Sequence, residues 1–287
     1  ERLTDTVIAD YIRHVCGTEN AYSKRLENLF RRLRKNALLL LRNLLHEFSQ
    51  SQFIPQFFEM PIQKNQTDSA TPLEIPLADG THIFVYGKID RVDTYTEGET
   101  VYLRIVDYKT GSKQFRLSDI QQGLNLQMLL YLFSLWNAPP RILLDAAGVD
   151  ENATVLPAGI LYFSAKPAPQ TLNAENFTTE NAMKAAEASL GRSGLLLAEE
   201  PVLRAMEQNL EGRYLPVSAK DLEHPEKVTS LTTLAEFGAL MQNVSETVAK
   251  IGEQIKQGIS DAIPRAEHEV SPCTYCAYGA VCRHTEE

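Results

Sequence analysis

The sequence predicts an α/β protein in which a β-sheet is covered by helices. Three observations predict this fold class: apolar residues at helical spacing over the first fifty residues, short β-branched and aromatic runs that begin at Phe53, and a helical stretch without proline over residues 231–259. Residues 51–170 follow the order βββαβ, which indicates a sheet with a helix on at least one face.

Composition limits the classes of function that this fold can serve. The 287 residues carry 28 lysines and arginines against 37 aspartates and glutamates, a net charge of -9, with 44% hydrophobic residues. That balance is typical of a soluble globular protein of one large or two small domains. The start lacks the layout of a secretory signal, and no run of about 18 apolar residues follows, so we expect a cytoplasmic protein. The acidic total argues against nonspecific coating of nucleic acid but allows a local basic groove.

Residues 1–50 are expected to form an N-terminal helical segment of two helices. Apolar positions recur every three or four residues, as in Leu26, Leu29 and Leu33. This segment is also the most basic part of the chain, with Lys24, Arg25, Arg31, Arg32, Arg34, Lys35 and Arg42. These cations form either a solvated helix surface or a surface that contacts phosphates.

Residues 51–170 are expected to form the core of the protein. Three runs, FIPQFFEMPI, THIFVYGKIDRVD and ETVYLRIVDYKTG, indicate antiparallel strands separated by turns at Asp79-Gly80 and Glu97-Gly98. The apolar spacing then predicts one amphipathic helix over 117–136, which Ser118 would cap and the prolines at 139 and 140 would end. The run PAGILYFSAKP supplies one further buried strand.

The last two segments differ in regularity. Residues 171–230 have weak periodicity, which favours an irregular insertion or linker with short helices. Residues 231–287 hold the clearest long helix and then an extended tail with cysteines. We therefore expect four segments, with boundaries at 1–50, 51–170, 171–230 and 231–287.

Two aspartates mark the predicted hairpin as a candidate metal site. Asp90 lies near the end of one strand and Asp107 near the end of the next, so a hairpin would bring their carboxylates side by side. Like charges at that distance need a cation or a shared proton, and carboxylate oxygens favour Mg²⁺ or Mn²⁺ over zinc. Lys109 points to the same face as Asp107 because strand side chains alternate. The alternative is a surface cross-strand pair worth roughly 0.2–1 kcal/mol.

A glutamine and a tyrosine lie on one face of the helix that follows. Gln127 and Tyr131 are four residues apart in the apolar stretch LNLQMLLYLFSL, so one lies above the other. A buried amide and phenol need hydrogen-bond partners. Those partners are either backbone groups or the metal-binding end of the sheet and a nucleic-acid backbone.

The order GKIDRVD, IVDYKTG and LNLQMLLY resembles the RecB-type nuclease domain of the PD-(D/E)XK superfamily. The strings PAGILYF and GLLLAEEPVLRAM and the tail CTYCAYGAVC are similar to the carboxy-terminal region of the AddB (RexB) subunits of bacterial AddAB helicase–nucleases. The resemblance covers the chain from about residue 20 to the end. It implies a restriction-endonuclease-like core, with a central mixed sheet flanked by helices and additional N- and C-terminal helices.

The resemblance also implies roles for five residues. Asp90 and Asp107 match the metal-binding acids, Lys109 matches the catalytic lysine, and Gln127 with Tyr131 matches the QxxxY motif. The implied activity is Mg²⁺-dependent exonuclease cleavage of a DNA strand, fed by an AddA-type helicase–nuclease partner during double-strand-break repair by homologous recombination.

The same resemblance matches Glu59 to an acid that the family carries in the preceding strand, which would either touch the metal or orient the catalytic lysine. The family's upstream histidine has no match here, and His46, in an apolar helix, is expected to be structural. No GxxxxGK[ST] loop is present in the sequence, so an ATP-driven motor would lie in another region or polypeptide.

The clustered cysteines predict a metal or cluster site. Cys273, Cys276 and Cys282 have two and five residues between them. The resemblance implies that they hold a four-iron four-sulfur cluster, whose fourth cysteine lies upstream of the nuclease motifs. The context of Cys16 departs from the family pattern, so we expect the fourth ligand before Glu1 and the chain to be a fragment of a longer subunit. Zinc is the alternative occupant.

Two further hypotheses come from other functional classes. The chain could be a non-catalytic DNA-binding or scaffold fragment of the same complex, with the sheet intact and the site idle. It could also be a zinc-stapled interaction domain without a role in nucleic-acid chemistry. A DNA-cleavage assay distinguishes the DNA-binding or scaffold fragment from a nuclease. Metal analysis of the purified protein distinguishes the zinc-stapled domain from a protein with an iron–sulfur cluster.

Overall fold

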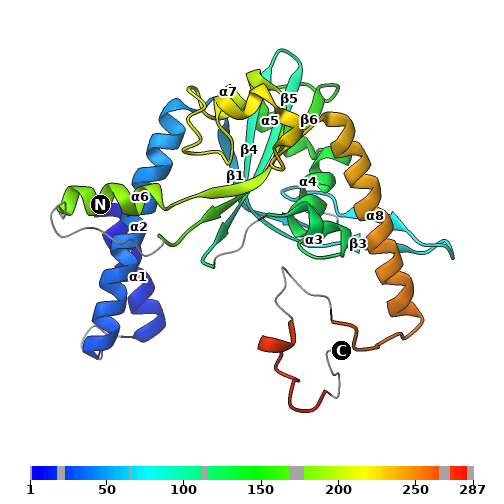
Figure 1. The fold of residues 1–287 in the computed structure, drawn as a ribbon, viewed down its shortest axis with the longest axis horizontal. Helices are drawn as coiled ribbons and strands as arrows, with labels where there is room; N and C mark the ends of the chain where they lie inside the picture. Colours follow the sequence, from blue (N-terminus) through cyan, green and yellow to red (C-terminus); the bar gives the residue numbers. More distant parts are fainter. Residues whose placement is uncertain are drawn as a thin grey trace.

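A six-stranded mixed sheet lies at the centre of the protein (Figure 1). The computed structural model describes residues 2–17, 23–64, 66–111, 115–167, 178–264 and 272–282. The strands of the sheet are β1 (Ile54–Ile62), β4 (Gly87–Glu97), β5 (Thr100–Lys109), β6 (Thr154–Ser164), β7 (Arg192–Leu197) and β8 (Leu231–Thr232). Their order is β1-β4-β5-β6-β7-β8, and the pairs β5–β6 and β7–β8 are parallel while the others are antiparallel. The expected mixed sheet flanked by helices is confirmed.

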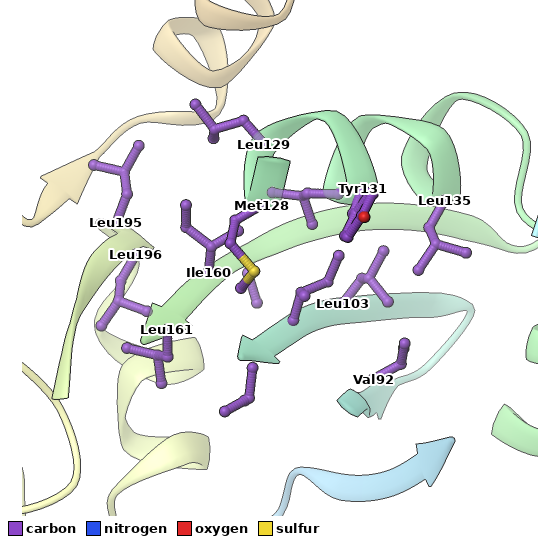
Figure 2. Packing of buried hydrophobic residues seen from close by; sticks show 14 of the residues in the cluster. Val92, Leu103, Met128, Leu129, Tyr131, Leu135, Ile160, Leu161, Leu195 and Leu196 are labelled. Atoms are coloured by element: carbon purple, nitrogen blue, oxygen red, sulfur yellow. The ribbon is translucent and has the colours of Figure 1, made fainter. Parts of the chain in front are cut away.

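The parallel pairing of β5 with β6 requires a crossover, and three helices form it. They are α3 (Leu117–Gln121), α4 (Gln127–Asn137) and α5 (Arg141–Ala147). Helix α4 packs on β5 and β6, and Figure 2 shows Met128 and Tyr131 of α4 beside Leu103 of β5 and Ile160 of β6. One face of the sheet is therefore covered by α4, and the buried apolar side chains between them form the core.

The single helix predicted over 117–136 is wrong, because the structure divides it. Helix α3 ends at Gln121, and Gly123 and Asn125 adopt positive φ angles of 78° and 57° before α4 begins. Glycine and asparagine tolerate this left-handed conformation, which ends a helix. Ser118 lies inside α3 rather than at its cap, which is Arg116.

The predicted strand THIFVYGKIDRVD also divides. Its first part is β3 (His82–Val85), which pairs with β2 (Leu73–Pro76) in a separate two-stranded sheet, and its second part is β4. The expected turns are present, since Gly80 and Gly98 adopt φ angles of 80° and 60°.

Two long helices begin the chain, as predicted. They are α1 (Arg2–Cys16) and α2 (Lys24–Gln50), and the Arg34 guanidinium of α2 donates to the Asp5 carboxylate of α1. In Figure 1, α2 extends away from the sheet, and α1 lies beside the part of α2 that is remote from the sheet. The last turns of α2 lie on the face of the sheet opposite α4, where Asn43 and Glu47 are buried.

Residues 178–206 hold more regular structure than the weak periodicity indicates. They form α6 (Thr179–Ala188), β7 and α7 (Glu200–Met206). Strand β7 lies between β6 and β8, and its last four residues are buried, so it carries a continuous apolar run instead of an alternating pattern. The predicted segment boundaries are not tested by these elements.

The long C-terminal helix is α8 (Leu234–Lys256), shorter at both ends than the 231–259 expected. Thr233 caps it, because its hydroxyl accepts from the Glu236 amide while the Glu236 carboxylate accepts from the Thr233 amide. Helix α8 packs on α4 and β2. In the parts of the chain that the structure describes, no helix is both long and apolar enough to cross a membrane.

Candidate active site

The β4–β5 hairpin brings the two predicted aspartates together. Arg91 pairs with Val106 in the antiparallel ladder, so Asp90 and Asp107 are the next residues along the two strands. Strand alternation places both on the face of Val92 and Ile105, which is the face that α4 covers. The predicted side-by-side placement of the two carboxylates is therefore what the register produces.

The Asp90 carboxylate is tied to the neighbouring strand. Its Oδ2 accepts a hydrogen bond of 2.9 Å from the Tyr108 backbone amide. A side-chain oxygen thus takes the position that a main-chain carbonyl would occupy if the ladder continued. This bond fixes Asp90 relative to Asp107, because Tyr108 is the residue that follows Asp107.

Asp107 and Lys109 form a close ion pair. The Lys109 Nζ lies 2.6 Å from the Asp107 Oδ2, and Asp107 is only 5% exposed while the lysine side chain is 26% exposed. The lysine therefore reaches from solvent to a buried carboxylate on the same face. This geometry brings together the three residues that the sequence selected, an acid on each strand and one amine.

Tyr162 of β6 is a neighbour of this ion pair that the sequence did not select. It pairs with Asp107 in the parallel β5–β6 register, and its ring centroid lies 5.6 Å from the Lys109 Nζ. Burial raises the pKa of the Tyr162 phenol, and the negative charges of Asp107 and Asp119 raise it further. The phenol consequently stays neutral at ordinary pH.

Glu59 contacts Lys88 in this structure, and Lys109 contacts Asp107. Glu59 lies between Phe58 and Met60, which pair with Arg91 and Ile89, and it adopts a positive φ of 56°, which is uncommon for a residue with a Cβ. Its carboxylate forms an ion pair with Lys88, two residues before Asp90. The hydrogen bond and charge of Glu59, and then the charge of Asp90, raise the Lys88 pKa. Glu59 therefore belongs to the surroundings of Asp90.

Gln127 and Tyr131 lie at the start of α4, above the beginning of β4. The Gln127 Nε2 donates to the Tyr131 Oη over 3.4 Å, so each side chain is a hydrogen-bond partner of the other, a pairing that neither expected alternative described. Tyr131 is 8% exposed, and a Cβ at Gly87 would overlap its phenol oxygen. The glycine of the GKIDRVD string thus lets the phenol lie against β4, three residues before Asp90.

The oxygen donors of the site suit an open Mg²⁺ or Mn²⁺ site. Mg²⁺ is usually held by one or two carboxylates together with waters and substrate phosphates, so Asp90 and Asp107 fit that requirement. The described residues contain no group of three or more His, Cys, Asp or Glu placed to hold a metal, so they do not form a site in which protein side chains supply every ligand.

The described part of the cysteine tail forms a tight turn. The Cys276 amide donates to the Cys273 carbonyl over 3.3 Å, and the Tyr278 amide donates to the Cys276 Sγ over 3.4 Å. Hydrogen bonds from amides to sulfur stabilise a thiolate. Within residues 272–282 the thiols of Cys273, Cys276 and Cys282 are not gathered into a metal-binding group, and the Cys16 side chain lies outside the described set.

His46 lies on the exposed side of α2. Its Nδ1 is 3.6 Å from the Glu187 carboxylate of α6, and its side chain is 62% exposed. This contact joins α2 to α6, and the structural role expected for His46 from the sequence stays a prediction.

A buried ion cluster behind the site was not predicted. It consists of Glu47, Arg91, Asp93, Arg104 and Arg192, which come from α2, β4, β5 and β7. The Arg91 and Asp93 side chains alternate with Asp90 and Val92, so they lie on the face opposite α4. The alternating charged residues of GKIDRVD are the sequence feature that could have indicated this cluster.

Glu47 is the residue of the buried ion cluster that joins α2 to the sheet. Its carboxylate lies 2.6 Å from Arg192, 3.3 Å from Arg104 and 3.4 Å from Arg91. Burial opposes ionisation of Glu47, but the charges of these three guanidinium groups outweigh it and hold its pKa below the usual range. Arg91 also donates to the Tyr108 Oη over 2.8 Å, so the cluster contacts the residue whose amide holds Asp90.

Comparisons with known proteins agree with these motifs. Residues 5–283 match the family model described as PD-(D/E)XK nuclease superfamily. The chain is 31% identical over 279 residues to the B subunit of the ATP-dependent helicase/deoxyribonuclease of Acetivibrio thermocellus, and 32% identical over 263 residues to that of Clostridium acetobutylicum. These matches cover 96% and 91% of the chain but 23% and 22% of the relatives, so the chain spans less than a quarter of their length.

Proposed function

Because the chain belongs to the PD-(D/E)XK nuclease superfamily, we propose that it is a Mg²⁺-dependent DNA phosphodiesterase. The observation that carries the proposal is the convergence of Asp90, Asp107 and Lys109 on one face of the β4–β5 hairpin, with Lys109 2.6 Å from Asp107. Two carboxylates and one amine at the end of adjacent strands suit the hydrolysis of a phosphate ester.

Each residue has a separate task in this proposal. Asp90 and Asp107 would hold the divalent ion, which when bound lowers the pKa of a water and offsets charge on the phosphate. Asp90 is held in place by the Tyr108 amide, and Asp107 holds the Lys109 amine beside its own carboxylate. The amine then stabilises the negative charge that develops during attack. Gln127 and Tyr131, joined by their hydrogen bond, would position the DNA strand beside β4.

The wider role follows from the names of the relatives. They are B subunits of ATP-dependent helicase/deoxyribonucleases, AddB proteins, which supports a cytoplasmic nuclease domain that trims DNA unwound by a helicase partner. We propose an AddA-type polypeptide as that partner and double-strand-break repair by homologous recombination as the process. The basic surface of α2 suits contact with DNA phosphates, because Arg31, Arg32 and Lys35 are exposed there.

We expect the chain to cut end-labelled single-stranded DNA with Mg²⁺ and to stop when the metal is chelated. Replacing Lys109 with alanine is expected to lower the cleavage rate by about 10²-fold, because the charge on the phosphate loses its amine. Gel assays of cleavage with matched Mg²⁺ concentrations measure this effect. Lys250→Ala is the matched control, since Lys250 is exposed on α8.

Two outcomes would contradict this assignment. Cleavage by the Lys109→Ala protein at the parent rate would remove Lys109 from the reaction. Binding of single strands with no metal-dependent cutting, and with unchanged affinity after Asp90→Ala, would favour the alternative of a DNA-binding or scaffold module.

We also propose that Cys273, Cys276 and Cys282 are ligands of a four-iron four-sulfur cluster in the longer subunit. The Tyr278 amide that donates to the Cys276 Sγ supports this proposal, because such bonds stabilise cluster thiolates. Anaerobically purified full-length subunit is expected to contain roughly four iron atoms per chain and to lose them after Cys276→Ser. Stoichiometric zinc in a colourless protein would contradict the cluster and favour a zinc-stapled domain.

A further inference from the structure

Tyr162 lies directly beside the proposed catalytic residues, on the strand next to them. It is 4% exposed on β6, where the parallel register pairs it with Asp107 and pairs Ser164 with Lys109. Its ring is consequently beneath the amine of Lys109, with 5.6 Å between the Nζ and the ring centroid. A cation within about 6 Å of an aromatic centroid is attracted to the ring face.

Lys109 needs more than one contact to hold its amine in one place. A lysine side chain has a flexible four-carbon stem, and a single ion pair leaves that stem free to adopt several rotamers. The Asp107 Oδ2 holds the amine from one side at 2.6 Å, and the Tyr162 ring lies on another side. The two contacts together restrict the amine to the space next to the carboxylates.

Tyr162 is itself well placed to serve as a rigid support. Its ring is enclosed in the core between β6 and the crossover helices, and Asp119 of α3 approaches its phenol closely enough to raise the phenol pKa, after burial and Asp107. The Asp119 carboxylate also accepts from the Asn125 amide over 2.7 Å, which ties α3 to the turn before α4. A residue packed in this way loses little additional entropy when a lysine rests on it.

We propose that Tyr162 is a positioning residue that holds the Lys109 amine in place through the face of its ring. This inference rests on the proposed nuclease function and extends it to a residue outside the motifs. The ring, and not the hydroxyl, provides the contact. Phenylalanine at position 162 should therefore preserve the effect and leucine should remove it.

The direct test is the NMR chemical shift of the Lys109 side chain in protein without metal or DNA. In protein labelled with ¹³C-lysine, the ε-methylene signal assigned through Lys109→Arg is expected to lie upfield of the other lysines because of the aromatic ring current. The shift should persist in Tyr162→Phe and vanish in Tyr162→Leu. Tyr95→Leu is the control, since Tyr95 lies on the other face of the sheet and stacks on Tyr102. An unshifted Lys109 signal in the parent protein would overturn the proposal even if Tyr162→Leu failed to fold.

Cleavage kinetics provide the second readout. Tyr162→Leu is expected to lower kcat about tenfold with the KM for DNA nearly unchanged, while Tyr162→Phe should stay within about twofold of the parent. Equal kcat for the parent and Tyr162→Leu would overturn the proposal. Failure of the nuclease function itself is distinguishable, because the parent would then not cut DNA although the Lys109 signal was still shifted.

Discussion

Replacing Asp107 with asparagine is expected to lower the rate of Mg²⁺-dependent DNA cleavage by about 10²–10³-fold. Asp107 is 5% exposed and supplies one of the two negative charges that would hold the ion. The amide is nearly the same size but carries no charge, so it weakens the metal site and releases the Lys109 amine from its ion pair. Initial cleavage rates over a range of Mg²⁺ concentrations measure the loss.

Two controls accompany this variant. Asp145→Asn changes an exposed carboxylate on α5, with a side chain 55% exposed, and should leave cleavage unchanged. The thermal unfolding temperature of Asp107→Asn should stay close to that of the parent, because removing one of two adjacent negative charges relieves repulsion. An Asp107→Asn protein that remains folded and cuts at the parent rate would exclude Asp107 from metal binding.

Replacing Glu47 with alanine is expected to reduce the free energy of unfolding by about 3–5 kcal/mol. The substitution removes a carboxylate that is 1% exposed and pairs with Arg91, Arg104 and Arg192. Arg91 and Arg104 then share Asp93, while Arg192 loses the Glu47 carboxylate, so the desolvation of the arginines is no longer fully offset. Urea unfolding followed by circular dichroism gives the free energy.

A surface glutamate serves as the matched control for Glu47. Glu180 forms an exposed ion pair with Lys184 one helical turn away, and Glu180→Ala should change stability by no more than about 0.5 kcal/mol. Similar unfolding free energies for Glu47→Ala and Glu180→Ala would show that the buried ion cluster does not stabilise the fold.

The contribution of Glu47 to stability is also expected to depend on pH. Because its pKa is lower in the folded chain than in the unfolded chain, ionised Glu47 stabilises the fold above the ordinary glutamate pKa of about 4.3. That contribution is lost as the pH falls through the lower, folded-state pKa. The parent should therefore lose more stability than Glu47→Gln between about pH 5 and pH 3. Equal losses in the two proteins would place the acid sensitivity in other carboxylates.

The sequence was sufficient to predict the parts of the site that depend on local spacing. Asp90, Asp107 and Lys109 lie on consecutive strands, and the period-two alternation alone places their side chains on one face. The pair of Gln127 and Tyr131 followed in the same way from the helical period. In both cases the spacing along one strand or helix determines which side chains share a face.

Contacts between distant segments could not be predicted in this way. Tyr162 lies beside Asp107 only because β5 and β6 are parallel and in one register, which no local pattern specifies. Glu47 meets Arg192 across 145 positions of the chain, so the charges were visible in the sequence while their pairing was not. The break between α3 and α4 was signalled by Gly123 and Asn125, but the apolar spacing outweighed those residues.

The first strand of the sheet has a consequence for assembly. Strand β1 is an outermost strand, and it contains Pro55 and Pro61, an irregularity in register between Pro55 and Phe57, and the left-handed residue Glu59. Prolines lack the amide hydrogen that an added strand would need, and irregular backbone disrupts a continuous ladder. The margin of the sheet formed by β1 therefore resists strand addition and amyloid-like stacking.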